Sequence, residues 1–295
     1  MLTIDQAYGP HKFGLSFELF PPKTEVGVEN LQFHLEKLMQ FRPSYVTCTY
    51  GAGGSTRDRT LEVIGGVRKK YQVPVATHLT CVGSTAEELR AYLRRARDLE
   101  VHNVVALRGD PPQGETKFQS IAGGFSYANE LVEFVRTEFP SLGIAVGGYP
   151  ETHLEAPSPQ VDLDNLERKV DAGADVVITQ LFYDNNDFFS FREQCTARGI
   201  RIPIVPGLLP VTNGAQIQRI SSLCGAKLPG PFLAELDRFE PGSEGQFEVG
   251  VEFAAQQTAD LIAAGVPGIH YYVLNKSEAI DRVLRAVEVP GNCDE

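Results

Sequence analysis

Residues 45–70 read YVTCTYGAGGSTRDRTLEVIGGVRKK, and this stretch contains the unit that decides the fold. The β-branched and aromatic run at 45–50 predicts a strand. A glycine-rich turn at 51–54 follows, and Ser55 or Thr56 could cap the helix that runs to the end of the stretch. The stretch therefore predicts one strand followed by one helix, a unit too short to form a domain alone.

The same alternation recurs along the chain. We expect strands at 15–20, 45–50, 73–80, 103–107, 144–149, 175–180, 202–208 and 269–274. We expect helices at 28–40, up to 70, 85–99, 127–138, 162–172, 186–198, 213–223 and 277–286. Residues 229–245 are expected to form an insertion before the last strand. Strict alternation of strands and helices implies a parallel sheet with helical crossovers.

Eight such units favour an α/β fold of the closed (β/α)8 TIM-type barrel, which needs about 250 residues. The alternative, an open doubly wound sheet, usually carries G-x-G-x-x-G after its first strand, and the sequence has no such loop. No Pro/Gly-rich linker divides the chain. We therefore expect residues 1–295 to form a single domain.

Composition narrows the function classes. The chain is 42% hydrophobic and 22% charged, and 27 Lys and Arg against 38 Asp and Glu give a net charge of −11. This balance argues against nucleic acid or an anionic membrane as the main partner. The N-terminus lacks the features of a signal peptide, and no apolar run is long enough to cross a bilayer. Five scattered cysteines without a C-x-x-C pair indicate reduced thiols in the cytoplasm and no metal site.

The active site of a (β/α)8 barrel lies at the carboxyl ends of the strands. Glu18 stands out there, because it lies in a strand between Phe17 and Leu19 where an apolar residue is usual. Desolvation is expected to raise its pKa towards a value useful for a general acid. The alternative is a carboxylate that is salt-bridged inside the barrel mouth. Other polar residues at expected strand ends are Thr49, His78, Arg108, Asp110, Tyr149, Glu151, His153, Gln180, Asn275 and Lys276.

Two further stretches contain residues that could bind a ligand, and each also has an ordinary structural explanation. In Leu107–Pro112, Gly109 permits close approach of a ligand to the backbone, while Arg108 and Asp110 offer a planar donor and an acceptor. A structural pair between Arg108 and Asp110 is the alternative. On the helix at 162–172, one face carries polar side chains that either bind a ligand or are simply solvated: Asp162, Asn165, Arg168 and Lys169. His78, taken alone, is better explained as a core histidine.

These motifs, taken in order, resemble the methylenetetrahydrofolate reductase family in its short bacterial form. The resemblance extends over nearly the whole chain. Its segments are Ser16–Pro22, Thr49–Ser55, His78–Cys81, Leu107–Pro112, Gly148–Glu151, Lys169–Ala174, Ile178–Gln180, Pro206–Pro210 and Tyr272–Asn275.

The resemblance implies non-covalent FAD, reduced by NADH or NADPH, usually NADH in short bacterial forms. The reduced flavin would then convert 5,10-methylenetetrahydrofolate to 5-methyltetrahydrofolate on the same face, a ping-pong scheme that supplies methyl groups for methionine synthesis. The resemblance also implies a homo-oligomer. Since the chain ends soon after the last expected helix, we expect no C-terminal regulatory domain.

Residue roles follow from the same resemblance. Glu18 matches the general acid that protonates folate N10, and Asp110 matches a catalytic residue beside the flavin and the pterin. The folate is expected to contact Glu18, Asp110, Gln180, Gln216 and Lys276. FAD is expected to contact Thr49, His78, Arg108, Gly109, Asp110, Tyr127, Ala128, Tyr149, His153, Asp162, Asn165, Arg168 and Lys169. In this scheme Arg168 and Lys169 neutralise the diphosphate of FAD.

The sequence departs from the family pattern at two positions. Lys276 stands where many relatives have Arg, and Ile220 lies near a position where some relatives have an aromatic residue. Two alternative functions stay open. A Schiff-base aldolase would require a buried lysine at a strand end, for which Lys276 is the candidate. A non-catalytic barrel that binds folate or flavin, or serves as a subunit of a larger reductase complex, is harder to separate by sequence.

Overall fold

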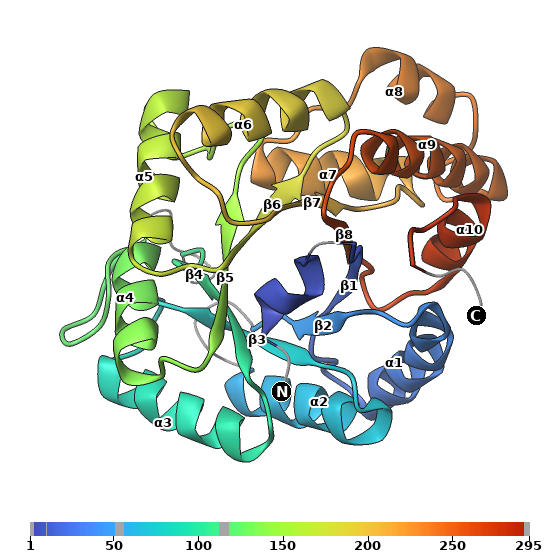
Figure 1. Cartoon of the computed structure of the whole chain (residues 1–295). Helices are drawn as coiled ribbons and strands as arrows, with labels where there is room; N and C mark the ends of the chain where they lie inside the picture. The colour runs from blue at the N-terminus through green and yellow to red at the C-terminus, as the bar shows by residue number, and fades with distance from the viewer. Residues whose placement is uncertain (1–2, 10, 51–55, 112–117, 292–295) are drawn as a thin grey trace.

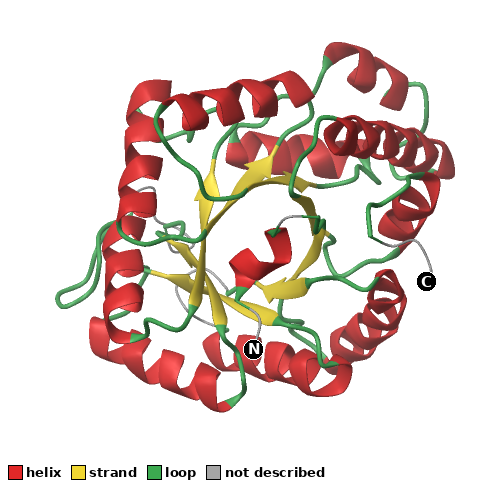
Figure 2. Cartoon of the chain, in the orientation of Figure 1, coloured by secondary structure: helices red, strands yellow, loops and turns green. Residues whose placement is uncertain are grey.

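The computed structural model describes residues 3–9, 11–50, 56–111 and 118–291. Eight parallel strands close into a barrel in sequence order, as Figure 2 shows in a view down the barrel. The strands are β1 (Gly14–Leu19), β2 (Tyr45–Cys48), β3 (Val75–Thr80), β4 (Asn103–Leu107), β5 (Gly143–Gly148), β6 (Val176–Leu181), β7 (Ile204–Leu208) and β8 (Gly268–Tyr272). The predicted (β/α)8 barrel is confirmed.

The helices form an outer layer around the strands (Figure 1). They are α1 (Glu25–Leu38), α2 (Arg57–Tyr71), α3 (Ala86–Asp98), α4 (Ala128–Glu138), α5 (Pro159–Asp171), α6 (Asn185–Ala197), α7 (Gly214–Cys224), α8 (Gly230–Leu236), α9 (Glu244–Ala263) and α10 (Glu278–Ala286). Among the described residues no helix combines the length and the apolar character needed to cross a membrane.

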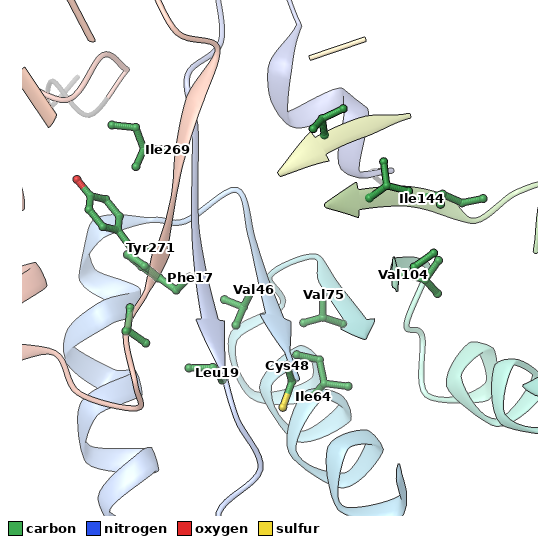
Figure 3. Close-up of a cluster of buried hydrophobic side chains, with 14 of the residues drawn as sticks. Phe17, Leu19, Val46, Cys48, Ile64, Val75, Val104, Ile144, Ile269 and Tyr271 are labelled. Atoms are coloured by element: carbon green, nitrogen blue, oxygen red, sulfur yellow. The ribbon is translucent and has the colours of Figure 1, made fainter. Parts of the chain in front are cut away.

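Alternation along each strand separates two cores. Phe17 and Leu19 of β1 point outwards and pack with residues of the helices and neighbouring strands, such as Ile64 of α2 (Figure 3). Ser16 and Glu18 alternate with them along the strand and therefore face the barrel interior. A one-residue shift of register would exchange these two sets, so burial of the apolar set fixes the orientation of Glu18.

The element between β7 and β8 differs from the prediction of an insertion at 229–245. Helix α8 lies within that range, and α9 begins at its end and continues for 20 residues. The side of α9 that is buried contains Gln246, Gln257 and Thr258 as well as apolar residues. Because polar side chains interrupt its apolar periodicity, the sequence pattern did not reveal this helix. The predicted turn at 51–54 and its possible cap Ser55 lie outside the described residues.

A short 3₁₀ helix, η1 (Ile4–Tyr8), was also missed by sequence reasoning. It lies in the middle of the ring of strands in Figure 1 and packs against the residues that fill the barrel interior. The backbone N–H of Ile4 donates to Asn103 Oδ1 at 2.7 Å, at the start of β4. The N-terminal end of the barrel is thus filled by the chain's own first turn, and the opposite end is left for a ligand.

Candidate active site

Glu18 lies at the mouth of the barrel between two imidazoles. Its Oε2 is 3.1 Å from Nε2 of His78 on β3 and 3.6 Å from Nε2 of His270 on β8. Both histidines are buried, and neither Nε2 has a well-aligned hydrogen-bond partner among the described residues. The three side chains therefore form a compact acid–imidazole cluster.

The expected rise in the pKa of Glu18 is wrong for this structure. Burial alone would raise the pKa of the carboxyl, but His78 and His270 outweigh burial and lower it to about 2. The sequence argument failed because it considered the apolar neighbours along β1 and not the imidazoles that neighbouring strands bring to the same place. The proposed alternative, a carboxylate paired inside the barrel mouth, describes the observed geometry.

His270 has a fixed orientation inside the barrel. Its Nδ1 lies 2.8 Å from the hydroxyl of Ser16, and its ring stacks on Tyr45 with centroids 6.4 Å apart. Sequence reasoning missed His270 and Ser16. The signal was present, because the inward set of β8 can be read by alternation from Tyr272 to His270, as that of β1 can from Glu18 to Ser16.

A cavity of about 450 Å³ opens beside Glu18. Glycines and apolar side chains from β4 to β8 form much of its wall. Eight of the residues predicted for the site line it together: Glu18, His78, Arg108, Gly109, Asp110, Tyr149, His153 and Gln180. The fold thus gathers residues that are separated by more than 160 positions in the sequence.

A second cavity of about 610 Å³ adjoins the first. The two share Leu209, Tyr272 and Leu274 in their linings, so they form one elongated depression. Gln216 and Lys276 line only the second cavity. Lys276 is exposed, which contradicts the buried lysine that a Schiff-base aldolase would require there.

Arg108, just after β4, does not form the ion pair with Asp110 that was the alternative to ligand binding. Arg108 forms a two-pronged ion pair with Glu155, at 2.6 and 2.8 Å, and Asp110 is exposed. The proposed Arg108–Asp110 pair is therefore wrong. Gly109 has φ of +86°, and a Cβ there would lie 2.8 Å from Val82 Cγ2. Only glycine fits this turn, which presents the backbone to the cavity.

The polar face of α5 lies behind the cavity and does not line it. Asp162 accepts from the backbone N–H of His153 at 2.9 Å, and Arg168 donates to Asn165 at 3.2 Å. The ammonium of Lys169 donates to the carbonyl of Gly147 at 2.5 Å, and burial lowers the pKa of Lys169 to about 8. This face holds the β5 end in place. Three other predicted cofactor residues also lie outside both cavities: Thr49, Tyr127 and Ala128.

Asn275 joins the ends of β1 and β8. Its side-chain amide accepts from the N–H of Phe20 at 3.0 Å and donates to the carbonyl of Phe20 at 2.8 Å. Asn275 and Leu274 both have positive φ, of 56° and 47°. This strained turn places Lys276 at the rim of the second cavity.

No cluster of three or more potential metal ligands occurs in the part of the chain that the structure describes. The four described cysteines are free thiols.

Comparisons with known proteins point to one family. The family model described as methylenetetrahydrofolate reductase matches residues 3–288. The chain is 40% identical over 279 residues to methylenetetrahydrofolate reductase (NADH) 1 of Arabidopsis thaliana, covering 91% of this chain and 47% of that protein. It is 37% identical over 267 residues to 5,10-methylenetetrahydrofolate reductase of Escherichia coli K12, covering 90% of this chain and 88% of that protein.

Among solved structures, a Clostridium thermocellum protein described as binding two copies of 5-methyl-5,6,7,8-tetrahydrofolic acid shares the fold. Its TM-score is 0.61 at 15% identity, covering 96% of this chain and 97% of that one. The chain spans about half the length of the plant relatives and most of the Escherichia coli relative. On the family match and the identities together, the chain belongs to the methylenetetrahydrofolate reductase family.

Proposed function

We propose that this protein reduces 5,10-methylenetetrahydrofolate to 5-methyltetrahydrofolate, with FAD as cofactor and NADH as reductant. The observation that carries the proposal is the Glu18 carboxylate, which lies between two buried imidazoles at the edge of the cavity. The relatives named as NADH enzymes support NADH over NADPH. The reaction would supply methyl groups for methionine synthesis.

The residues around the first cavity fit a flavin. His78 has a buried Nε2 without an aligned hydrogen-bond partner among the described residues, and Gly109 and Gly147 leave backbone rather than side chain at the wall. Arg108 and Tyr149 add a guanidinium and an aromatic ring. FAD, when bound, supplies the reversible transfer of a hydride. The protein's own contribution is to hold the ring against Glu18 and exclude water.

Other residues would hold the remainder of the cofactor outside this cavity. We assign this role to the residues that the family resemblance names and that lie beyond the cavity wall: Thr49, Tyr127, Ala128, Asp162, Asn165, Arg168 and Lys169. Tyr127 is 61% exposed and is therefore free to stack on a planar group. Arg168 is also exposed, whereas Lys169 is partly buried against Gly147. Arg168 is thus the better placed cation for a diphosphate.

The elongated depression fits a folate. We place the pterin end in the first cavity near Asp110 and Gln180, and the glutamate tail in the second cavity near Gln216 and Lys276. Lys276 offers a single mobile ammonium to a tail carboxylate in place of a planar guanidinium. Glu18 then lies on the side of the bridge carbon and N10.

Proton delivery is the catalytic task of this chain. Opening the five-membered ring of the substrate needs a proton on N10. Because His78 and His270 lower the pKa of Glu18 to about 2, the carboxyl is ionised at neutral pH in the protein without ligand. We propose that the cluster stores the proton and that Glu18 passes it to N10 when folate displaces water from the cavity.

An absorption spectrum of the purified protein tests the proposal. Bound FAD gives a yellow protein whose bands bleach with NADH in the absence of oxygen and recover on addition of 5,10-methylenetetrahydrofolate. Bleaching without recovery would leave a flavoprotein of another reaction. A colourless protein that takes up no FAD and yet binds folate would support the non-catalytic alternative. A cytoplasmic location and a homo-oligomeric state remain predictions.

A further inference from the structure

One layer of the barrel interior contains polar side chains where such barrels usually have Val, Ile or Leu. Ser16 pairs in register with Tyr45 on β2 and with His270 on β8. All three are at most 1% exposed. Other strands contribute apolar side chains to the interior, such as Val105 of β4 and Val205 of β7. The polar residues thus gather on one side of the barrel, directly beneath Glu18 in the inward set of β1.

Two hydrogen-bonded pairs lie among these side chains, and Ser16 and Tyr45, one from each pair, are register partners on neighbouring strands. His270 Nδ1 lies 2.8 Å from Ser16 Oγ, and the hydroxyls of Tyr45 and Tyr8 are 2.5 Å apart. Burial raises the pKa of both phenols, and hydrogen bonding to the Ser16 hydroxyl offsets part of that rise. Glu18 Oε2 lies 3.6 Å from His270 Nε2, an ion-pair distance, so polar groups follow one another from the site carboxylate to η1.

Tyr45 lies close to the N-terminal face of the barrel, which is opposite the mouth where Glu18 lies. Tyr45 lines a cavity of about 390 Å³ formed by η1, the segment before β1 and the start of β2. His11, Lys12 and Arg42 line the same cavity and are exposed, so water has access to it. This cavity lies at the amino ends of the strands, away from the proposed folate and flavin sites.

We propose that His270, Ser16, Tyr45 and Tyr8 form a proton path that reloads Glu18 from water on the N-terminal face of the barrel. The inference rests on the proposed function, in which each turnover consumes one proton at folate N10. The bound folate and flavin would cover the mouth and restrict water there. A path through the barrel interior supplies the proton from the side that ligands leave open.

The steps of the path balance. Glu18 accepts a proton from His270 Nε2, and His270 Nδ1 accepts one from Ser16 Oγ. Ser16 accepts from Tyr45, which in turn accepts from Tyr8 or from a water molecule in the lower cavity. Each hydroxyl both loses and gains a proton, so the net change is one proton moved from water to Glu18. No oxidant or further reactant is required.

The experiment must distinguish the proton path from a purely structural role of these side chains. The same hydroxyls could serve only to attach η1 to the barrel and to orient His270. Tyr45→Phe removes the phenolic hydroxyl and keeps the ring that stacks on His270. The matched control is Tyr271→Phe on β8, a fully buried tyrosine that faces outwards and bonds Thr258 at 2.7 Å. Both variants lose one buried hydroxyl, but only the first lies on the path.

The experiment compares the first turnover with later ones. Flavin reoxidation by 5,10-methylenetetrahydrofolate is followed in a single turnover, and NADH consumption is followed in the steady state, in H₂O and in D₂O. For Tyr45→Phe and Tyr8→Phe we expect a first turnover at the wild-type rate and a steady state slowed roughly tenfold, with a larger solvent isotope effect. Tyr271→Phe should match the wild type in both.

Two kinetic results would overturn the path. If Tyr45→Phe turns over like the wild type, the proton enters from the mouth. If its first and later turnovers slow equally, the hydroxyl only positions His270. Imidazole ¹⁵N NMR of the protein without folate gives a further readout, with His270→Asn used for assignment. The path requires a proton on Nε2 of His270, and a neutral Nδ1–H form contradicts it. If wild-type protein shows no flavin reoxidation by folate, the proposed function itself fails.

Discussion

The Glu18 carboxylate lies 3.1 Å from the imidazole of His78, although β1 and β3 are not neighbours in the barrel. Strand β2 lies between them, so the two side chains meet only because the sheet curves into a barrel. Charge attraction at this distance in a buried site is strong enough to reverse the effect of burial on the carboxyl. The imidazoles therefore keep the Glu18 carboxyl ionised despite its burial.

Substitution Glu18→Gln should separate the two half-reactions. The amide keeps the shape of the side chain but cannot donate a proton to N10. We expect flavin reduction by NADH to continue, while reoxidation by 5,10-methylenetetrahydrofolate falls by about 10²- to 10⁴-fold. Stopped-flow spectra of each half-reaction measure this. An equal loss in both would reject the acid role of Glu18.

The same substitution should change how stability depends on pH. The pKa of Glu18 is lowered in the folded protein from 4.5 to about 2. A lowered pKa contributes stability above pH 4.5, and that contribution is lost as the pH falls towards 2. Its size is up to roughly 3 kcal/mol. In urea unfolding, the wild type should have a higher unfolding free energy than Glu18→Gln at pH 6, and this difference should shrink as the pH falls to 3. A constant difference across this range would contradict the ion pair.

Gly109→Ala should damage both the fold and cofactor binding. At φ of +86° a new Cβ lies 2.8 Å from Val82 Cγ2 and 3.0 Å from Thr80 Cβ. Gly199→Ala is the matched control, since its φ is +83° and nothing lies within 4 Å. The control should lose about 1 kcal/mol of unfolding free energy through backbone strain alone. Gly109→Ala should lose clearly more and retain less FAD, as measured by urea unfolding and flavin fluorescence. Equal losses would mean that the contact relaxes freely.

Removing the amide of Asn275 should loosen the join between β1 and β8. Asn275→Gly keeps the positive φ without strain but removes both hydrogen bonds to Phe20, which should cost about 1 to 3 kcal/mol. Asn275→Ala should cost about 1 kcal/mol more, because alanine is strained at φ of 56°. Since Lys276 follows directly, KM for folate should rise in both. Equal stability of the Gly and Ala variants would contradict the strain.

Neutralising the α5 cations should weaken FAD retention. Arg168→Met removes an exposed charge that donates to Asn165. Lys169→Met also removes the bond to the Gly147 carbonyl, so we expect lower thermal stability in addition. Fluorescence titration gives the Kd for FAD, and thermal unfolding separates the two variants. Unchanged FAD affinity in both would reject the assignment of this helix face to the cofactor.

Much of the architecture was readable from the sequence. The eight strands and their main helices follow from short β-branched runs alternating with helical periodicity, because each face must bury its apolar side. Glu18 and Gly109 could be singled out because a carboxylate inside a strand and a glycine at a strand end break the local pattern. Helix α9 escaped, since buried polar residues such as Gln246 and Gln257 hide its inner face.

The sequence by itself determined the alternating architecture, the family resemblance and the candidate residues at the strand ends. Only the tertiary structure decided what those residues do to one another. His270 is 252 positions from Glu18 and reaches it because the barrel closes between β8 and β1. Electrostatic interactions depend on distance in space rather than along the chain. The direction of the Glu18 pKa shift, the Arg108 partner and the polar series beneath the site therefore became visible only in the folded molecule.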